Sequence, residues 1–176
     1  MSGSVFSGVS GIKPRGDFSY IGPGNYLLHV EEFKTSKDRK GIGQAFFRLR
    51  IVDVIDTVLC VRANMLPHRV GETLSWLWKM NSDMSLPSVK RALMTLTGVD
   101  EEKITEEFCE QCASAAQPLV GMFVTYEGKQ ITTGKGISIT DRRFVRRVGK
   151  LELQGNPQWA KACHELKLSF DNADDS

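Results

Sequence analysis

The sequence predicts a mainly β protein, a small closed barrel of five or six strands with a helical insertion near residues 85–116 and a C-terminal helix. Segments in which apolar residues alternate at period two dominate the chain, whereas helical spacing is confined to its middle and its end. The length of 176 residues is that of one ordinary domain. A composition of 41% hydrophobic and 25% charged residues is typical of globular proteins and excludes whole-chain disorder.

Two long strands are expected first, at residues 26–33 and 44–54. A Gly-Pro-Gly turn at residues 22–24 precedes the first strand. A charged loop at residues 34–43, which ends in two closely spaced glycines, joins the two strands. The pair is therefore predicted to form a long hairpin.

The remaining elements follow from the same two periodicities. Further strands are expected at residues 57–63, 73–80, 119–127 and 137–148. Helices are expected at residues 85–97, where apolar residues recur at helical spacing up to Gly98, at residues 100–112, and from the N-cap Asn156 and Pro157 onward. The last helix carries Trp159 and Cys163 on one apolar stripe.

The two ends of the chain differ in composition from the expected domain at residues 20–168. Residues 1–19 begin with a Ser/Gly-rich stretch and are expected to form a flexible arm. Residues 169–176 are expected to form an acidic tail, since no basic residue follows Phe170. The sequence shows no secretion signal and no apolar run long enough to span a membrane, so a cytoplasmic protein with four reduced cysteines is expected.

Positive charge is concentrated in two segments, although the formal net charge is only +2. Residues 34–50 contain six basic residues against one acid, and residues 129–150 contain seven against one. These segments together carry +11, and the rest of the chain carries −9. Because both segments are predicted hairpins or strands, they would form an electrostatic groove if they lie together.

Aromatic and basic side chains alternate within both segments. Phe47 is expected in the core, with Phe46, Arg48 and Arg50 on the opposite face, and arginines flank Phe144 in the same way. Rings stack on bases and guanidinium groups hold phosphates, as single-strand binding without a sequence code requires. A slip of one residue in register would instead bury either phenylalanine and leave the charges as solvated surface.

The candidate binding residues come from these segments and from one tryptophan outside them. They are Lys34, Lys37, Arg39, Lys40, Phe46, Arg48, Arg50, Trp76, Lys129, Lys135, Arg142, Arg143, Phe144, Arg146 and Arg147. Trp76 and Trp78 share one strand face, so at least one is expected in the core and the other at the mouth of the groove.

No motif indicates an enzyme, a metal or a cofactor. The glycine-rich residues 128–136 lack the Ser or Thr and the following helix of a phosphate loop. The acids nearest the basic segments, Asp38 and Asp141, are too few for the metal centre of a nuclease. Four residues have side chains that can act as zinc ligands: Cys109, Cys112, Cys163 and His164. The helical patterns around the three cysteines instead favour buried thiols.

Several segments together resemble phage-type single-stranded DNA-binding proteins: GPGNY at residues 22–26, the charged hairpin from Lys34, LMTLTGV at residues 93–99 and LVGMFVTYEGK at residues 119–129. The resemblance spans residues 22–148 and extends to the acidic tail. It implies an OB-fold, a Greek-key barrel of five strands whose aromatic and basic face binds the strand. It also implies that the acidic C-terminus recruits replication or recombination enzymes, or competes with DNA. The residues that would do so are Phe170, Asp171, Asp174 and Asp175.

The sequence thus predicts a non-enzymatic protein that coats single-stranded DNA in phage replication, recombination or repair, in the host cytoplasm. The expected partners are single-stranded DNA and replication or recombination proteins, whereas the oligomeric state and the preference for DNA over RNA stay open. The alternative is a structural or assembly protein of a phage whose basic β face binds an acidic protein partner.

Overall fold

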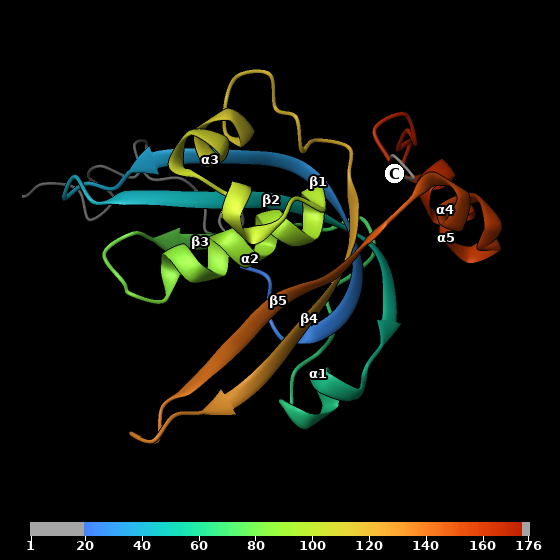
Figure 1. The fold of residues 1–176 in the computed structure, drawn as a ribbon. Helices are drawn as coiled ribbons and strands as arrows, with labels where there is room; N and C mark the ends of the chain where they lie inside the picture. Colours follow the sequence, from blue (N-terminus) through green and yellow to red (C-terminus); the bar gives the residue numbers. More distant parts are fainter. Residues whose placement is uncertain (1–19, 174–176) are drawn as a thin grey trace, which may run out of the picture.

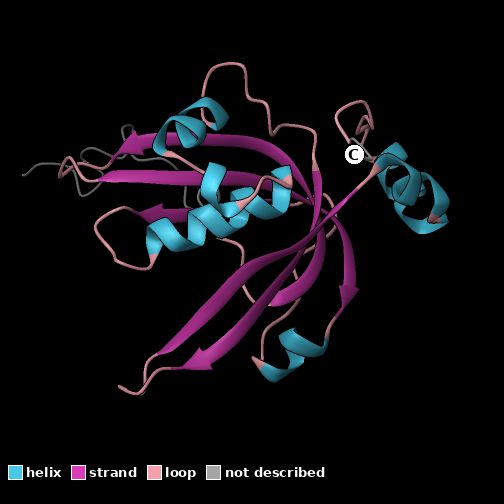
Figure 2. Ribbon diagram, viewed as in Figure 1, coloured by secondary structure: helices cyan, strands magenta, loops and turns pink. Residues whose placement is uncertain are grey.

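The computed structural model describes residues 20–173, whose five strands form one antiparallel sheet in the order β3-β2-β1-β4-β5 (Figure 1). The strands are β1 (Gly24–Lys37), β2 (Gly43–Asp56), β3 (Thr73–Lys79), β4 (Phe123–Thr132) and β5 (Ser138–Val148). The helices are α1 (Val58–Arg62), α2 (Ser85–Thr97), the 3₁₀ helix η3 (Glu101–Lys103), α3 (Glu106–Cys112), α4 (Lys150–Gly155) and α5 (Pro157–Glu165). The mainly β prediction is confirmed (Figure 2). No helix in the described part of the chain is long and apolar enough to cross a membrane.

Two long hairpins make up most of the sheet. β1 pairs with β2 up to the tip at Lys37 and Gly43, and β4 pairs with β5 up to Thr132 and Ser138. Both tips extend toward the same side of the molecule, the left of Figure 1. The strand predicted at residues 119–127 begins later and runs further, because a turn with Gly121 in the left-handed region (φ 92°) precedes β4.

One face of the sheet carries the main hydrophobic core. Phe47 and Leu49 of β2 are fully buried there, as their alternation predicts. α2 covers this face with the buried Leu93 and Leu96. It ends as predicted at Gly98, which adopts the left-handed conformation (φ 68°) that glycine permits.

A second, smaller hydrophobic cluster lies on the opposite face, against α4 and α5. Trp159 and Cys163 are buried in it, and Asn156 caps α5 by accepting a hydrogen bond from the Trp159 N–H (3.2 Å), as predicted. Asp53 of β2 is buried beneath α5 and accepts 2.8 Å hydrogen bonds from Trp159 Nε1 and Gln158 Nε2. These bonds compensate the burial of the carboxylate and fix α5 on the sheet.

The two edge strands, β3 and β5, are joined through the residues that precede β1. Ile21 is fully buried and donates its N–H to the Ser75 carbonyl of β3 (3.0 Å). The Ile21 carbonyl accepts a 2.7 Å hydrogen bond from Arg142 Nε of β5. The described sheet is therefore open, and its two edges are linked by Ile21 rather than by the strand pairing that the predicted closed barrel requires.

Two predicted elements are wrong, and α4 was not predicted. Residues 57–63 form α1 instead of a strand, because the Asp56 carboxylate accepts a hydrogen bond from the Val58 N–H (3.1 Å) and turns the chain. Residues 100–112 divide into η3 and α3, because Thr105 has an extended backbone (φ −95°, ψ 168°) and caps α3 through its side chain.

Candidate nucleic-acid interface

The structure distributes the predicted binding residues over three places: the exposed face of β1, β2 and β3, the two hairpin tips, and a pocket between α2 and β5. The pleat of β2 separates the residues of the exposed face from those of the pocket. Phe47 pairs with Trp76 of β3 and both are buried, so Phe46 and its basic neighbours point to the opposite face. Phe46 and Trp76, both predicted to bind the strand, therefore lie on opposite faces of the sheet.

The exposed side of β1, β2 and β3 is called here the outer face, and it consists of Tyr20, Lys34, Phe46, Arg48 and Leu77. Phe46 is partly exposed and pairs with Lys34 on one side and Leu77 on the other. Ser75 pairs with both Arg48 and Tyr20, and paired residues share a face. Tyr20, 53% exposed, thus adds a second aromatic side chain to this face, next to Ser75 and on the far side of it from Arg48. Sequence reasoning missed Tyr20 because a single bridge leaves no periodic pattern.

Glu32 of β1 neutralises part of the positive charge of the outer face. Its carboxylate contacts Lys34 and lies 3.4 Å from Arg48 Nη1. The Glu32 side chain is only 16% exposed, whereas both cations are more than half exposed. The carboxylate therefore lies beneath the two cations, which remain accessible to a ligand.

Arg50 lies further along the same strand face and is less accessible. Its Nε is 3.0 Å from Glu31 Oε1, as an ion pair rather than a directed hydrogen bond. The same oxygen is 3.0 Å from His29 Nδ1. The hydrogen bond with His29, together with the nearby arginines, holds the pKa of Glu31 below its usual range. Arg50 is thus held in a partly buried charged cluster at the end of the outer face.

The β1–β2 hairpin ends in three exposed cations, called here the tip cations: Lys37, Arg39 and Lys40. Within residues 20–173, their side chains form no hydrogen bond or ion pair. Asp38 shapes this tip, since its Oδ1 accepts hydrogen bonds from the Lys40 N–H (2.8 Å) and the Ile42 N–H (2.9 Å). The only acid of the segment therefore orders the loop that presents the tip cations.

The β4–β5 hairpin is less positive than its sequence suggests. Glu127 binds Lys129 at 2.9 Å and Arg143 at 3.0 Å. The hydrogen bond from Lys129, with the charge of Arg143, holds the pKa of Glu127 below its usual range. Lys135 is exposed at the tip and has no side-chain partner in the described part of the chain. Lys135 is the cation of this hairpin that is most available to phosphate.

The other three arginines of β5 have partners within the fold. Arg142 bonds to the Ile21 carbonyl, and Arg147 donates to the Leu96 carbonyl of α2 (3.3 Å). Arg146 forms a two-pronged pair with Glu152 of α4, with one N–H···O distance of 2.7 Å. These contacts link β5 to neighbouring elements, a structural role that the charge count did not reveal.

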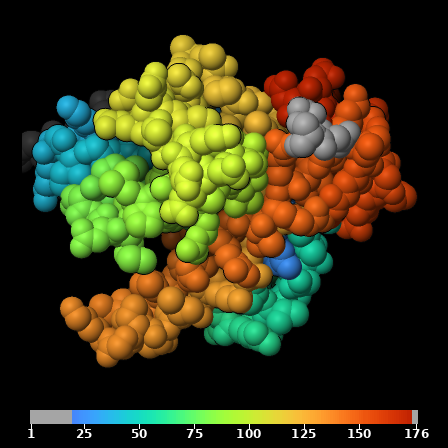
Figure 3. Space-filling model, in the orientation of Figure 1, coloured from blue at the N-terminus to red at the C-terminus, as the bar shows by residue number. Residues whose placement is uncertain are grey.

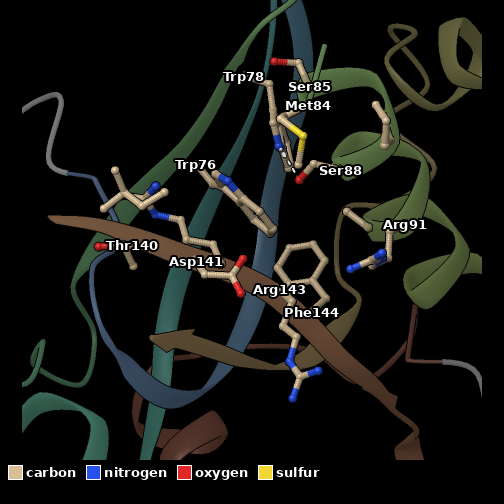
Figure 4. A pocket seen from close by; sticks show the side chains of 14 residues that line it. Trp76, Trp78, Met84, Ser85, Ser88, Arg91, Thr140, Asp141, Arg143 and Phe144 are labelled. Carbon is tan, nitrogen blue, oxygen red and sulfur yellow. Dashed lines mark hydrogen bonds between the residues drawn. The ribbon is translucent and has the colours of Figure 1, made fainter. Parts of the chain in front are cut away.

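A pocket of about 300 Å³ opens between α2, β3 and β5 (Figure 4). In Figure 3, the surface is hollowed between the green β3–α2 region and the orange β4–β5 hairpin. Trp76, Trp78 and Phe144 form its apolar wall, with the Trp76 centroid 4.3 Å from that of Trp78 and 5.1 Å from that of Phe144. All three are only 4–6% exposed, so Trp76 and Phe144, both predicted to bind the strand, present little of their rings to solvent. Arg91 of α2 also lines the pocket, and sequence reasoning missed it because it lies outside the basic segments.

The C-terminal segment stays packed on the domain as far as the structure describes it. Phe170 is partly buried against Phe123, with ring centroids 6.2 Å apart. Ala173 is buried and hydrogen-bonded to the start of α4. Asp171 is exposed. The predicted flexible arm at residues 1–19 and the acids Asp174 and Asp175 lie outside the described residues.

The conceivable zinc ligands are separated by the sheet. Cys112 belongs to the main core, and Cys163 to the cluster on the opposite face. Burial raises the pKa of both thiols to about 11. Among residues 20–173, no three His, Cys, Asp or Glu side chains are grouped as metal ligands. Both cysteines are protonated packing residues at neutral pH.

No protein family model matches the chain, and no curated protein matches its sequence. The function must therefore be inferred from the outer face, the hairpin tips and the pocket themselves.

Proposed function

We propose that the protein is a non-enzymatic OB-fold protein that binds single-stranded DNA along its outer face. In an OB-fold, a partly open Greek-key barrel of five strands, the face of strands 2 and 3 and the loops 1–2 and 4–5 bind oligonucleotides. The strand order, the bridge between β3 and β5, and the position of α2 after β3 support this assignment. The outer face lies mainly on β2 and β3, and the two hairpin tips correspond to the two loops.

The observation that carries the proposal is the row of exposed rings and cations on the outer face, next to the tip cations. Tyr20 and Phe46 present rings to bases, and stacking contributes about 1–3 kcal/mol per base. Lys34 pairs with Phe46, and Arg48 lies on the same face two residues further along β2, so both cations can hold phosphates next to a base stacked on Phe46. Because phosphate contacts carry no direct sequence information, the outer face should bind with weak sequence preference.

The test is fluorescence anisotropy with a labelled oligo-dT, with a duplex of equal length as the control. A labelled strand is required because Trp76 and Trp78 are too buried to report on the outer face. If about six phosphates are neutralised, log K should fall with log salt at a slope of about −4. Equal affinity for the duplex, or salt-independent binding, would contradict the proposal.

A pair of variants tests whether the outer face is the contact surface. Tyr20→Ala should weaken binding of oligo-dT by about fivefold or more, since one stacked base is lost. Val58→Ala on α1 is the matched control, because Val58 is 52% exposed and Tyr20 is 53% exposed. If the two variants bind oligo-dT with equal affinity, the outer face is not the contact surface. Binding to acidic proteins in place of DNA would favour an assembly protein.

The same proposal gives the acidic tail a role in replication, recombination or repair. Asp171, Asp174 and Asp175 would recruit partner enzymes or compete with DNA for the cations, as the resemblance implies. Removal of residues 174–176 should leave the affinity for oligo-dT equal or higher. A clear loss of affinity would contradict competition by the tail.

A further inference from the structure

The pocket between α2, β3 and β5 has features that phosphate binding on the outer face does not explain. Its volume of about 300 Å³ lies at the lower end of the range for small-molecule sites, about 300–1,000 Å³. It is flanked by the β4–β5 hairpin, whose tip lies on the same side as the tip cations. The pocket and the outer face lie on opposite sides of β3, which is an edge strand, so a strand bound to the outer face can place one base in the pocket by passing around this edge.

The floor of the pocket is aromatic and held in place by its own contacts. Trp76 and Phe144 meet edge to face at an interplanar angle of 89°. Trp78 Nε1 donates a 2.8 Å hydrogen bond to Ser88 Oγ of α2, which fixes the second indole (Figure 4). Such a rigid apolar floor suits a single planar ring that enters the pocket, rather than a run of stacked bases.

Asp141 is the unexpected group at this site. It lines the pocket, and in Figure 4 its carboxylate is turned toward the ring of Phe144. Within residues 20–173, the side chain has no hydrogen bond and no ion pair, although basic residues follow it directly in β5. A free carboxylate beside a phosphate-binding surface weakens binding by repulsion unless it contacts a hydrogen-bond donor of the ligand.

The bases differ in what they offer to a carboxylate, which only accepts hydrogen bonds. Guanine presents two adjacent donors, N1–H and the N2 amine, on its Watson–Crick edge. Cytosine and adenine each present one amine. Thymine has no amine, and its only donor lies between two carbonyl oxygens that repel a carboxylate.

We infer that the pocket receives one unstacked base of the bound strand, and that Asp141 selects guanine by accepting both donors of its Watson–Crick edge. Trp76 and Phe144 contact the ring, and Arg91, which lines the pocket and is exposed, can bind the neighbouring phosphate. This inference rests on the proposed single-strand binding. It adds one base-selective position to an otherwise sequence-tolerant interface.

The experiment compares oligo-dT with the same oligonucleotide carrying a single central dG, dC or dA. Anisotropy of the label measures total binding, and quenching of the Trp76 and Trp78 fluorescence reports on the pocket. The dG strand should bind about fivefold tighter or more, the lower end for a bidentate base contact, and should quench most strongly. Asp141→Asn should remove this preference and leave binding of oligo-dT equal or tighter. Asp100→Asn removes one negative charge from another exposed acid and should leave the preference for dG unchanged.

The outcomes separate this inference from the proposed function. If no single strand binds, the proposed function fails. If oligo-dT binds but the four strands have equal affinities, or Asp141→Asn keeps the preference for dG, the base-selective pocket is refuted while single-strand binding stands. Because Asp141 is exposed and lies on an edge strand, its replacement should leave the fold intact, which circular dichroism can verify.

Discussion

Replacement of Glu32 by glutamine should strengthen binding of single-stranded DNA. The Glu32 carboxylate contacts Lys34 and lies 3.4 Å from Arg48. A phosphate held by either cation would lie about 7 Å from this carboxylate, where two unit charges in water repel by about 0.6 kcal/mol. Screening at 0.1 M salt reduces the repulsion by about half. Two such phosphates therefore give a gain of about 0.6 kcal/mol, which is about threefold in affinity.

The assay is anisotropy of a labelled oligo-dT at two salt concentrations. The gain of Glu32→Gln should be about threefold at 0.1 M salt and about fivefold at tenfold lower salt, because screening weakens. Glu165→Gln on α5 removes the same charge far from the β1–β2 tip in Figure 1 and should leave the affinity unchanged. Stability should change by less than about 1 kcal/mol, as for other exposed ion pairs. An unchanged or lower affinity of Glu32→Gln would show that Lys34 and Arg48 hold no phosphate.

Four further predictions concern the tip cations, Ile21, Asp53 and the pair formed by Arg146 and Glu152. Replacing all three tip cations with alanine should make the slope of log K against log salt shallower by about 2, because each phosphate of a single strand contributes about 0.7 to this slope. An unchanged slope would show that this tip does not contact the strand. Ile21→Ala should cost about 2–5 kcal/mol in urea unfolding, because Ile21 is fully buried, and a cost below about 1 kcal/mol would argue against its bridging role. Asp53→Ala should cost at least about 1–3 kcal/mol, since the Trp159 indole N–H loses its acceptor, and calorimetry can check this loss. The hydrogen bond from Arg146 lowers the pKa of Glu152 below 4.5. This ion pair should therefore stabilise the fold fully above about pH 4.5, and its stabilisation should be lost progressively as the pH falls through the lowered pKa. Acid unfolding of Arg146→Ala should then show a smaller pH dependence in that range.

Local sequence signals predicted the elements that are determined by neighbouring residues. Period-two alternation located β1, β2, β3 and β5, because one face of each strand had to be buried. Gly98 and Asn156 marked the ends of two helices, because backbone conformation and capping depend on residues a few positions away. The same signals failed at residues 57–63, where a side chain that caps a turn outweighed β-branched residues.

The candidate site was predictable in its residue types but not in its arrangement. The Arg-Phe alternation correctly separated Phe46 from Phe47. It could not show that the cross-strand partner of Phe47 is Trp76, which sends this tryptophan to the core face. Arg91 and Tyr20 carried no local signal, because each reaches its place through contacts with residues far away in the sequence.

The sequence by itself determined the mainly β architecture, the segregation of charge into two segments and the alternation of rings with cations. Only the tertiary structure decided which of those cations are available. Glu32 and Glu127 pair with basic residues of their own hairpins, and Arg142 is committed to the Ile21 carbonyl. Charges can be counted along the chain without knowledge of the fold, whereas the strength of an ion pair depends on the distance between its two groups in space. Strand pairing and the bridge between the edge strands set these distances.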